Sequence, residues 1–300
     1  MKKKYWITGI SLSALILAGT TISAFASNDG YDLFKEAMKN SHKVKNASVS
    51  IEASMKDNGQ LIQGMKMTTD YNLIDKLGKG NVIVETPTES MNFNLFYQDN
   101  DFMIKNDAQE KYFVVQGSEL TEAEQREKFE SHHNPELLSL AEKVFDTLTI
   151  QTHDDFVITE ENGLQTITAD LTSEEIPSLI QEGSEYMLKK MLSTHANATM
   201  ESSKYPFLSG NISVKMPVLV DNFELEHVKV VTNLTADKLI DDQKVYVKFS
   251  GTDKDGKKHV LESVMNMDYS NINNTSIQPI TVDPSETTTL DKSLFKHGHK

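Results

Sequence analysis

Apolar and polar residues alternate along the first part of the chain in a pattern that changes once, from a helical period to a strand period. Over residues 29–45 the apolar residues Leu33, Ala37 and Met38 recur at helical spacing, which predicts a first helix. From Ser48 the period becomes two. Alternating segments separated by polar turns then predict six strands, at 48–56, 65–73, 82–87, 91–97, 102–105 and 112–115. Strands in this order predict an antiparallel meander with one apolar face and one face in water.

The remaining residues divide into helical and strand patterns in the same way. Helices are expected at 119–131 and 135–148, and a third after Thr172 and Glu175, which have the spacing of a capping box. Further strands are expected at 156–159, 164–171, 223–234, 244–249 and 260–269. Residues 196–210 have the composition of a loop, and turns are expected at 161–163, at Asp241-Asp242 and at 253–256.

The apolar face of the predicted strands is rich in flexible side chains. The residues that share its phase are Met55, Met65, Met67, Met91, Phe93, Leu95, Tyr97, Met265 and Met267. Methionine is flexible and polarisable and suits irregular apolar surfaces. We therefore expect these residues to line a ligand site, while an ordinary core filled by the predicted helices remains the alternative.

The N-terminus has the pattern of a cleavable signal peptide over residues 1–26. Three lysines at 2–4 precede an apolar run at 7–18 and the small residues of Ala24-Phe25-Ala26. The apolar run is shorter than the roughly 20 residues of a membrane span. Leu17-Ala18-Gly19-Thr20 resembles a lipobox with threonine in place of the lipidated cysteine. We expect a secreted protein, extracellular or loosely wall-associated, without a stable membrane anchor.

Beyond the signal peptide, we expect one domain over 27–277 and a flexible tail over 278–300, where Pro279, Pro284 and a run of threonines stand. The chain has 30 Lys+Arg and 44 Asp+Glu, so the net charge is −14. Removing the three lysines of the leader leaves 27 positive against 44 negative side chains. Such an acidic protein repels nucleic acid and anionic lipid headgroups. We therefore expect no nucleic-acid partner.

The residues that could carry chemistry form no recognised catalytic or metal-binding pattern. The chain has no cysteine, and its adjacent His132 and His133 cannot share one ion on a helix. Residues 253–256 begin like a calcium loop, but Lys257 and Val264 stand where oxygen ligands are needed. Nucleophile elbows, phosphate-binding glycine loops and zinc-protease motifs are missing from the sequence. We expect no enzyme activity, metal or cofactor.

The order of the predicted elements resembles that of a known family. The first helix runs into Val49-Ser50-Ile51-Glu52-Ala53, and a hairpin at 253–257 leads into the final strand. Over about residues 31–274 this arrangement resembles the LolA/LppX-like family of envelope proteins, in particular secreted or lipoprotein members from Gram-positive bacteria.

The resemblance implies an α+β fold in which a strongly curved antiparallel sheet, a half-barrel, wraps several helices around an apolar cavity. It also implies binding of a lipid or acyl chain on the concave face. The alternative is a module that binds a protein partner and regulates cell-envelope or cell-wall enzymes.

Overall fold

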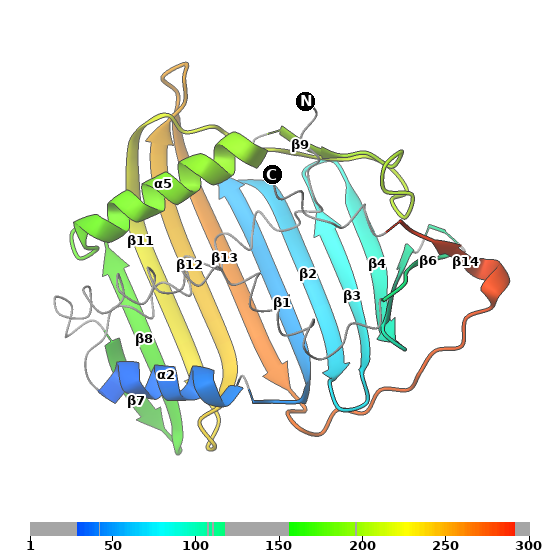
Figure 1. Cartoon of the computed structure of the whole chain (residues 1–300). Coiled ribbons are helices and arrows are strands. Elements are labelled where there is room, and N and C mark those ends of the chain that lie inside the picture. The colour runs from blue at the N-terminus through cyan, green and yellow to red at the C-terminus, as the bar shows by residue number, and fades with distance from the viewer. Residues whose placement is uncertain are drawn as a thin grey trace.

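One twelve-stranded sheet dominates the structure, a computed structural model that describes residues 29–41, 43–106, 108–109, 111–117, 156–195 and 197–291 (Figure 1). The strand order is β14-β6-β5-β4-β3-β2-β1-β13-β12-β11-β8-β7. All neighbouring pairs are antiparallel except β14 and β6, which run parallel. The strands of the sheet are β1 (Asn46–Asp57), β2 (Gln60–Asn72), β3 (Leu77–Glu85), β4 (Ser90–Gln98), β5 (Asp101–Asn106), β6 (Tyr112–Val115), β7 (Phe156–Glu161), β8 (Leu164–Thr172), β11 (Asp221–Leu234), β12 (Ile240–Thr252), β13 (Lys258–Ser270) and β14 (Thr287–Thr289).

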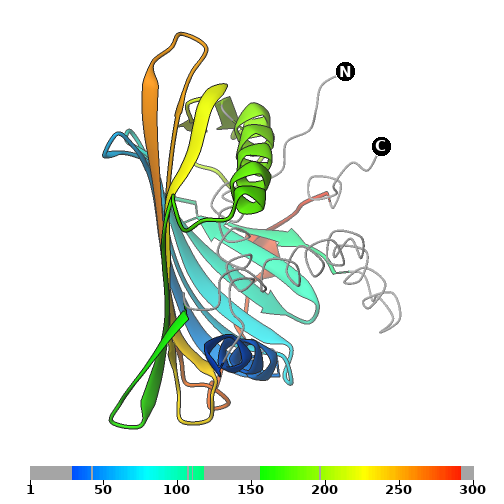
Figure 2. The same cartoon turned by 90° about the vertical axis from the view of Figure 1, so that its left-hand side faces the viewer.

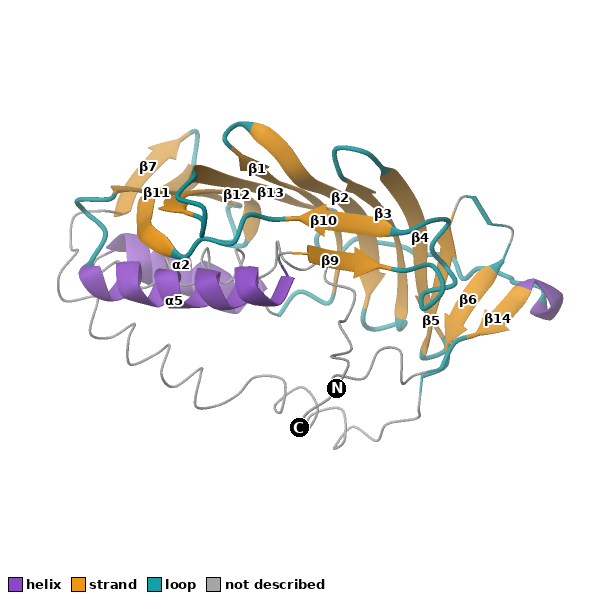
Figure 3. Ribbon diagram, turned by 90° about the horizontal axis from the view of Figure 1, so that it is seen from above, coloured by secondary structure: helices purple, strands orange, loops and turns teal. Residues whose placement is uncertain are grey.

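Two α-helices and a small ribbon complete the described part of the chain. The helices are α2 (Asp29–Ser41) and α5 (Ser178–His195), and the ribbon pairs β9 (Asn197–Met200) with β10 (Ile212–Lys215). A short 3₁₀ turn, η2 (Pro284–Glu286), precedes β14. Figure 2 shows the sheet edge-on, with α2 and α5 on the same side. Seen from above in Figure 3, the sheet curves, and the helices and ribbon lie on its concave side, which we call the inner face.

Local sequence explains why the strands turn where they do. Asn58 and Gly59 have φ values of 49° and 79°, and Asn162 and Gly163 have φ values of 54° and 78°. Asparagine and glycine adopt this left-handed conformation at low cost, so both pairs make tight hairpin turns, as the sequence predicts. The last long strand, β13, then pairs with β1, which joins the first and last meanders into a single sheet.

The apolar core lies on the inner face and is covered by three segments. Helix α5 contributes the buried Leu188 and Leu192. Helix α2 packs Leu33, Phe34 and Ala37 against the sheet in a smaller, separate cluster. After α5 and β9, residues 201–219, which we call the covering segment, bury the apolar side chains of Tyr205, Phe207, Leu208, Ile212, Val214, Met216 and Leu219.

The expected α+β fold with an antiparallel sheet around several helices is wrong. The described protein is mostly β, its sheet is mixed because β14 runs parallel to β6, and two helices lie against it. The physical reason is that the covering segment, expected in part to be a loop, supplies apolar cover that we had assigned to helices. The helices expected at 119–131 and 135–148 lie outside the described residues.

Several element boundaries also differ from expectation. Helix α2 ends at Ser41 and not at Lys45. Asp241 and Asp242 lie inside β12, and the preceding turn is at 235–239. The backbone and hydroxyl of Thr172 both bond to the Glu175 carboxylate at 2.8 and 2.7 Å, but α5 begins only at Ser178.

The beginning of the expected tail is bound to the sheet. The backbone N–H of Ile280 donates to the Gln98 side chain at 2.9 Å, and Thr287–Thr289 pair with β6 as β14. Leu290 follows and is buried. Residues 278–291 are therefore part of the folded domain, because a short β strand can attach to an open sheet edge even when its side chains carry no apolar pattern.

Among the described residues, we find no helix with the length and apolar character that crossing a bilayer requires.

Candidate functional site

The inner face carries two neighbouring rows of apolar side chains that run across five strands. Directly paired residues lie on the same face of a sheet, so the strand register defines each row. The first row is Met91, Val84, Met65, Ala53 and Met265. The second row is Phe93, Val82, Met67, Ile51 and Met267. Leu95, Thr69 and Val49 continue this face in a third row.

The rows differ in how completely they are covered. In the first row Met91, Ala53 and Met265 are buried, and Val84 and Met65 are partly buried. The second row has one buried residue, Phe93. The partly buried apolar side chains of the second and third rows form a group that we call the half-covered strip: Val49, Ile51, Met67, Val82, Leu95 and Met267. Partial exposure of neighbouring apolar side chains on a concave face is the property expected of a surface that accepts an apolar ligand.

Two glycines of β3 lie on the inner face next to this strip. Gly80 pairs with Leu95 and Thr69, and Gly78 pairs with Tyr97 and Tyr71. Each therefore leaves out a side chain between two larger neighbours. A Cβ atom at Gly80 would lie 2.8 Å from the Thr68 carbonyl oxygen, so the close approach of the backbone there requires glycine.

The covering segment closes one side of the strip with aromatic side chains. The Phe207 ring lies 6.2 Å from the Phe93 ring and 6.3 Å from the Phe113 ring, both with edge-to-face geometry. Tyr205 packs beside Phe207 at 5.9 Å. Phe93 is consequently 7% exposed and belongs to the packed core.

The nine residues expected to line a ligand site thus share one face but have different surroundings. Met55, Met91, Phe93 and Met265 are buried in the core. Met65, Met67, Leu95 and Met267 are partly buried. Tyr97 is 38% exposed near the end of β4, where Phe102 of β5 pairs with it and is 36% exposed. Neither the covering segment nor the role of the glycines was predicted from the sequence, although two glycines spaced by two in a strand indicate close approach of the backbone.

The opposite face of the sheet, which we call the outer face, is polar. Across its strands Ser48 donates to Asp70 at 2.6 Å, and Asn81 donates to Asn92 at 2.6 Å. Tyr246 donates to Glu262 at 2.8 Å, and partial burial with this hydrogen bond raises the pKa of Tyr246 to about 12. The contrast between the faces locates a candidate apolar site on the inner face.

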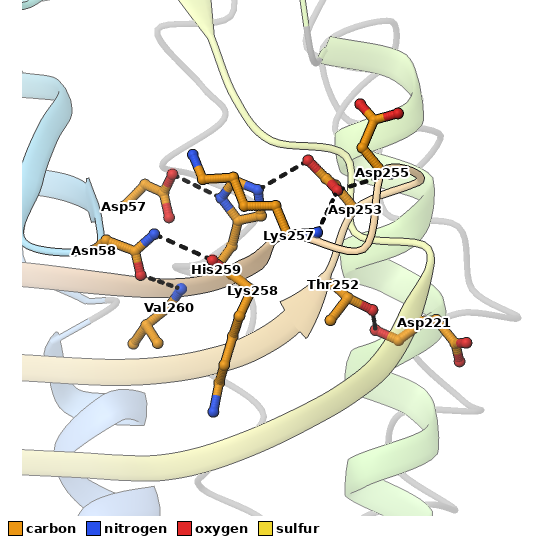
Figure 4. A network of polar contacts seen from close by, with 10 residues as sticks. All are labelled: Asp57, Asn58, Asp221, Thr252, Asp253, Asp255, Lys257, Lys258, His259 and Val260. Atoms are coloured by element: carbon orange, nitrogen blue, oxygen red, sulfur yellow. Dashed lines mark hydrogen bonds and ion pairs between the residues drawn. The ribbon is translucent and has the colours of Figure 1, made fainter.

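A buried histidine joins two turns at the upper edge of the sheet (Figure 4). His259 of β13 is 5% exposed; its Nδ1 lies 2.8 Å from Asp57 Oδ2, and its Nε2 lies 3.2 Å from Asp253 Oδ2. A protonated imidazole donates to both carboxylates, whereas a neutral imidazole donates to only one. The neighbouring Asn58 side chain accepts from the backbone N–H of Val260 at 3.2 Å. These contacts hold the β1–β2 turn to the β12–β13 turn.

The Asp253 carboxylate of this cluster is occupied by the protein itself. Asp253 Oδ1 accepts the backbone N–H groups of Asp255 and Lys257, each at 2.9 Å. The Lys257 N–H, and then the His259 hydrogen bond, hold the pKa of Asp253 below its ordinary value. The expected hairpin turn at 253–256 is therefore confirmed. The described residues contain no group of three or more histidine, aspartate or glutamate side chains that could hold a metal ion.

Comparison with known proteins gives distant structural neighbours. No protein-family model matches the chain, and no curated protein sequence is detectably similar. A crystal structure of a LolA superfamily protein from Nitrosomonas europaea aligns with 90% of this chain and 99% of its own, at 9% identity and a TM-score of 0.20. A beta-barrel-like protein of a domain of unknown function from Brucella abortus aligns with 75% of this chain and 99% of its own, at 8% identity and a TM-score of 0.19.

Likenesses at these TM-scores are too weak to place the chain in a family. They give no support to a Gram-positive origin.

Proposed function

We propose that the protein is a non-enzymatic binding module that holds an apolar ligand, such as a fatty acyl chain, on the inner face of its sheet. The half-covered strip is the observation that supports this function. It runs from β4 across β3, β2 and β1 to β13. Four strand spacings of ~4.8 Å give a length of about 19 Å, which is comparable with an acyl chain.

The composition of the strip fits an apolar ligand of variable shape. Met67 and Met267 can change conformation at little cost. Hydrophobic contact is not directional, so such a surface holds a ligand by the apolar area it buries. The pattern of residues 1–26 further supports a site of action outside the cytoplasm.

Two adjacent residues of β3 provide a matched test. Val82 belongs to the half-covered strip, whereas Ile83 lies on the outer face, and both are partly buried aliphatic side chains. We expect the wild-type protein to take up an acyl-chain fluorophore and V82N to weaken this uptake roughly tenfold or more, since a polar group would enter the apolar contact. I83N should lose comparable stability but keep uptake.

Native mass spectrometry of protein purified from its own host gives an independent readout, because a bound lipid would add a defined mass. If the wild type takes up no probe, or if both variants lose uptake equally, the proposed function is wrong. Pull-down of envelope proteins would then be the next measurement.

A further inference from the structure

The turn between β2 and β3 presents two large aliphatic side chains to solvent. Leu73 is 59% exposed and Ile74 is 71% exposed. Figure 1 places this turn at the lower edge of the sheet, close to the start of β1. Isolated exposed apolar residues are common, but two adjacent ones on a projecting turn form a small continuous apolar tip. We call residues 73–74 the apolar tip.

Hydrogen bonds hold the apolar tip in place. The buried Asn72 accepts the backbone N–H groups of Ile74 and Asp75, each at 3.0 Å, and its amide donates to the Asp75 carboxylate at 2.8 Å. The backbone N–H of Leu73 donates to the carbonyl of Lys45 at 2.8 Å. The exposure of Leu73 and Ile74 is therefore built into an ordered turn.

The surroundings of the apolar tip are basic although the protein is acidic. Residues 39–48 and 70–79 together contain five lysines and two aspartates, whereas the whole chain has a net charge of −14. Lys43, Lys45 and Lys76 are exposed, and the backbone contact between Leu73 and Lys45 brings the two segments together. The loop at 270–278, which carries no charged side chain, lies alongside through a 2.8 Å bond from Asn273 to Asn46.

The two aspartates in these segments already have partners. Asp70 accepts from Ser48 at 2.6 Å and pairs with Lys79 at 3.3 Å, and Asp75 accepts from Asn72. With five lysines against two aspartates, the two segments around the apolar tip carry a net charge of +3. The net charge of the chain predicts repulsion from an anionic surface, but this corner has the opposite sign.

We propose that the apolar tip docks on the surface of an anionic lipid bilayer, with Leu73 and Ile74 entering the headgroup region and Lys43, Lys45 and Lys76 contacting the headgroups. Aliphatic residues surrounded by lysine are the pattern of interfacial membrane binding, because the lysine stems lie along the apolar boundary while their charges meet anionic lipid. Repulsion of the acidic remainder of the protein favours approach to the bilayer through the apolar tip.

A protein partner fits the apolar tip less well. Protein interfaces concentrate their binding energy in tryptophan, tyrosine and arginine within closely packed pockets. The apolar tip is instead a projecting turn, and the two segments around it, residues 39–48 and 70–79, contain no tryptophan or arginine, while their one tyrosine, Tyr71, is partly buried. Two aliphatic side chains give contact that is weak and reversible, which a bilayer surface can accommodate without shape complementarity.

Vesicle flotation tests the proposal. The assay uses the exported protein, whose N-terminus is determined by sequencing beforehand. Vesicles of phosphatidylcholine alone are compared with vesicles that also contain phosphatidylglycerol. We expect binding to the anionic vesicles that falls with salt, and a roughly tenfold loss in the double variant L73S/I74S. The control V218S/V220S removes two other exposed aliphatic side chains, at 37% and 46% exposure, and should bind as the wild type does.

Insertion is measured directly with an I74W variant in a W6F background, since Trp6 is the only tryptophan of the chain. A blue shift of its emission on anionic vesicles supports the proposal. The proposal is overturned if the wild type binds neither kind of vesicle, or if both double variants lose the same amount of vesicle binding. It is also overturned if the protein binds but the I74W emission does not shift. Uptake of the acyl fluorophore should be unchanged in L73S/I74S, so this proposal and the proposed function can fail separately.

Discussion

At the scale of single residues, the two glycines of β3 differ in what they permit. A Cβ atom at Gly80 would stand 2.8 Å from a backbone oxygen that cannot move away cheaply, whereas at Gly78 its nearest neighbour is the Tyr97 Cβ at 3.4 Å. The same substitution should therefore have different results at two positions on the same face of one strand.

We expect G80A to lower the free energy of unfolding by about 1–3 kcal/mol, because the backbone must shift to relieve the contact. G78A should be neutral or stabilising by about 0.5 kcal/mol, since it removes backbone freedom from the unfolded chain. Urea denaturation of both variants measures the difference. Equal changes in the free energy of unfolding at the two sites would show that the nearby Thr68 carbonyl oxygen does not require glycine at position 80.

The ionisation of the Asp253 carboxyl group makes the stability of the protein depend on pH in the acid range. Its lowered pKa means that folding favours the ionised carboxylate, so this stabilisation is present above the ordinary value near 4 and is lost as pH falls through the lowered pKa. We expect D253N to be less stable than the wild type at neutral pH, and the difference between them to shrink on acidification.

Thermal melts across this pH range measure the effect. D255N is the control in the same turn, because Asp255 contributes its backbone N–H to Asp253 and its side chain is exposed. The role assigned to Asp253 would be contradicted if the difference in melting temperature between D253N and the wild type stayed constant down to the most acid pH.

Burial of individual lining residues could not be predicted from the sequence. Alternation placed Phe93 and Met67 on the same face correctly, because side-chain direction in a strand is a local property. It could not show that Phe207, more than a hundred positions away, packs on Phe93, while Met67 stays partly uncovered. That distinction depends on tertiary contacts.

At the scale of elements, the covering segment covers apolar side chains of the inner face that helices were expected to cover. Its buried residues are separated by Pro206, Ser209 and Gly210, so no helical period is visible, and residues 196–210 have the composition of a loop. The opposite error occurred at Asp241-Asp242, where polar residues inside β12 have the composition of a turn. Strong alternation predicted most strands, whereas segments without a period were assigned by composition alone.

Phe207 should be the residue on which the covering segment depends. We expect F207A to lower the free energy of unfolding by about 3–5 kcal/mol, because it removes the edge contacts to Phe93 and Phe113 and leaves a cavity. The control L164A truncates a side chain that is 54% exposed and should change stability by less than about 0.5 kcal/mol. Chemical denaturation of both variants measures these changes. If F207A left the free energy of unfolding nearly unchanged, the covering segment would be only loosely attached to the sheet.

At the scale of the whole molecule, the two faces of the sheet have separate properties. The outer face is polar, and the inner face holds the core and the half-covered strip. The sequence predicted this division because a period of two assigns alternate residues to opposite faces. It did not predict that β14 would extend the sheet, since three threonines near the end of the chain carry no apolar pattern.

The β1–β13 pairing also has a consequence for how the chain folds. Asp57 and His259 are separated by 202 positions, so the strands that they connect cannot meet until almost the whole polypeptide is available. Contacts of such long range slow the search for the native state. Until β13 arrives, one edge of β1 offers unpaired backbone groups to any other extended chain, which is a hazard for aggregation. A cell that makes this protein therefore has reason to keep the nascent chain apart from its copies until the last hairpin is complete.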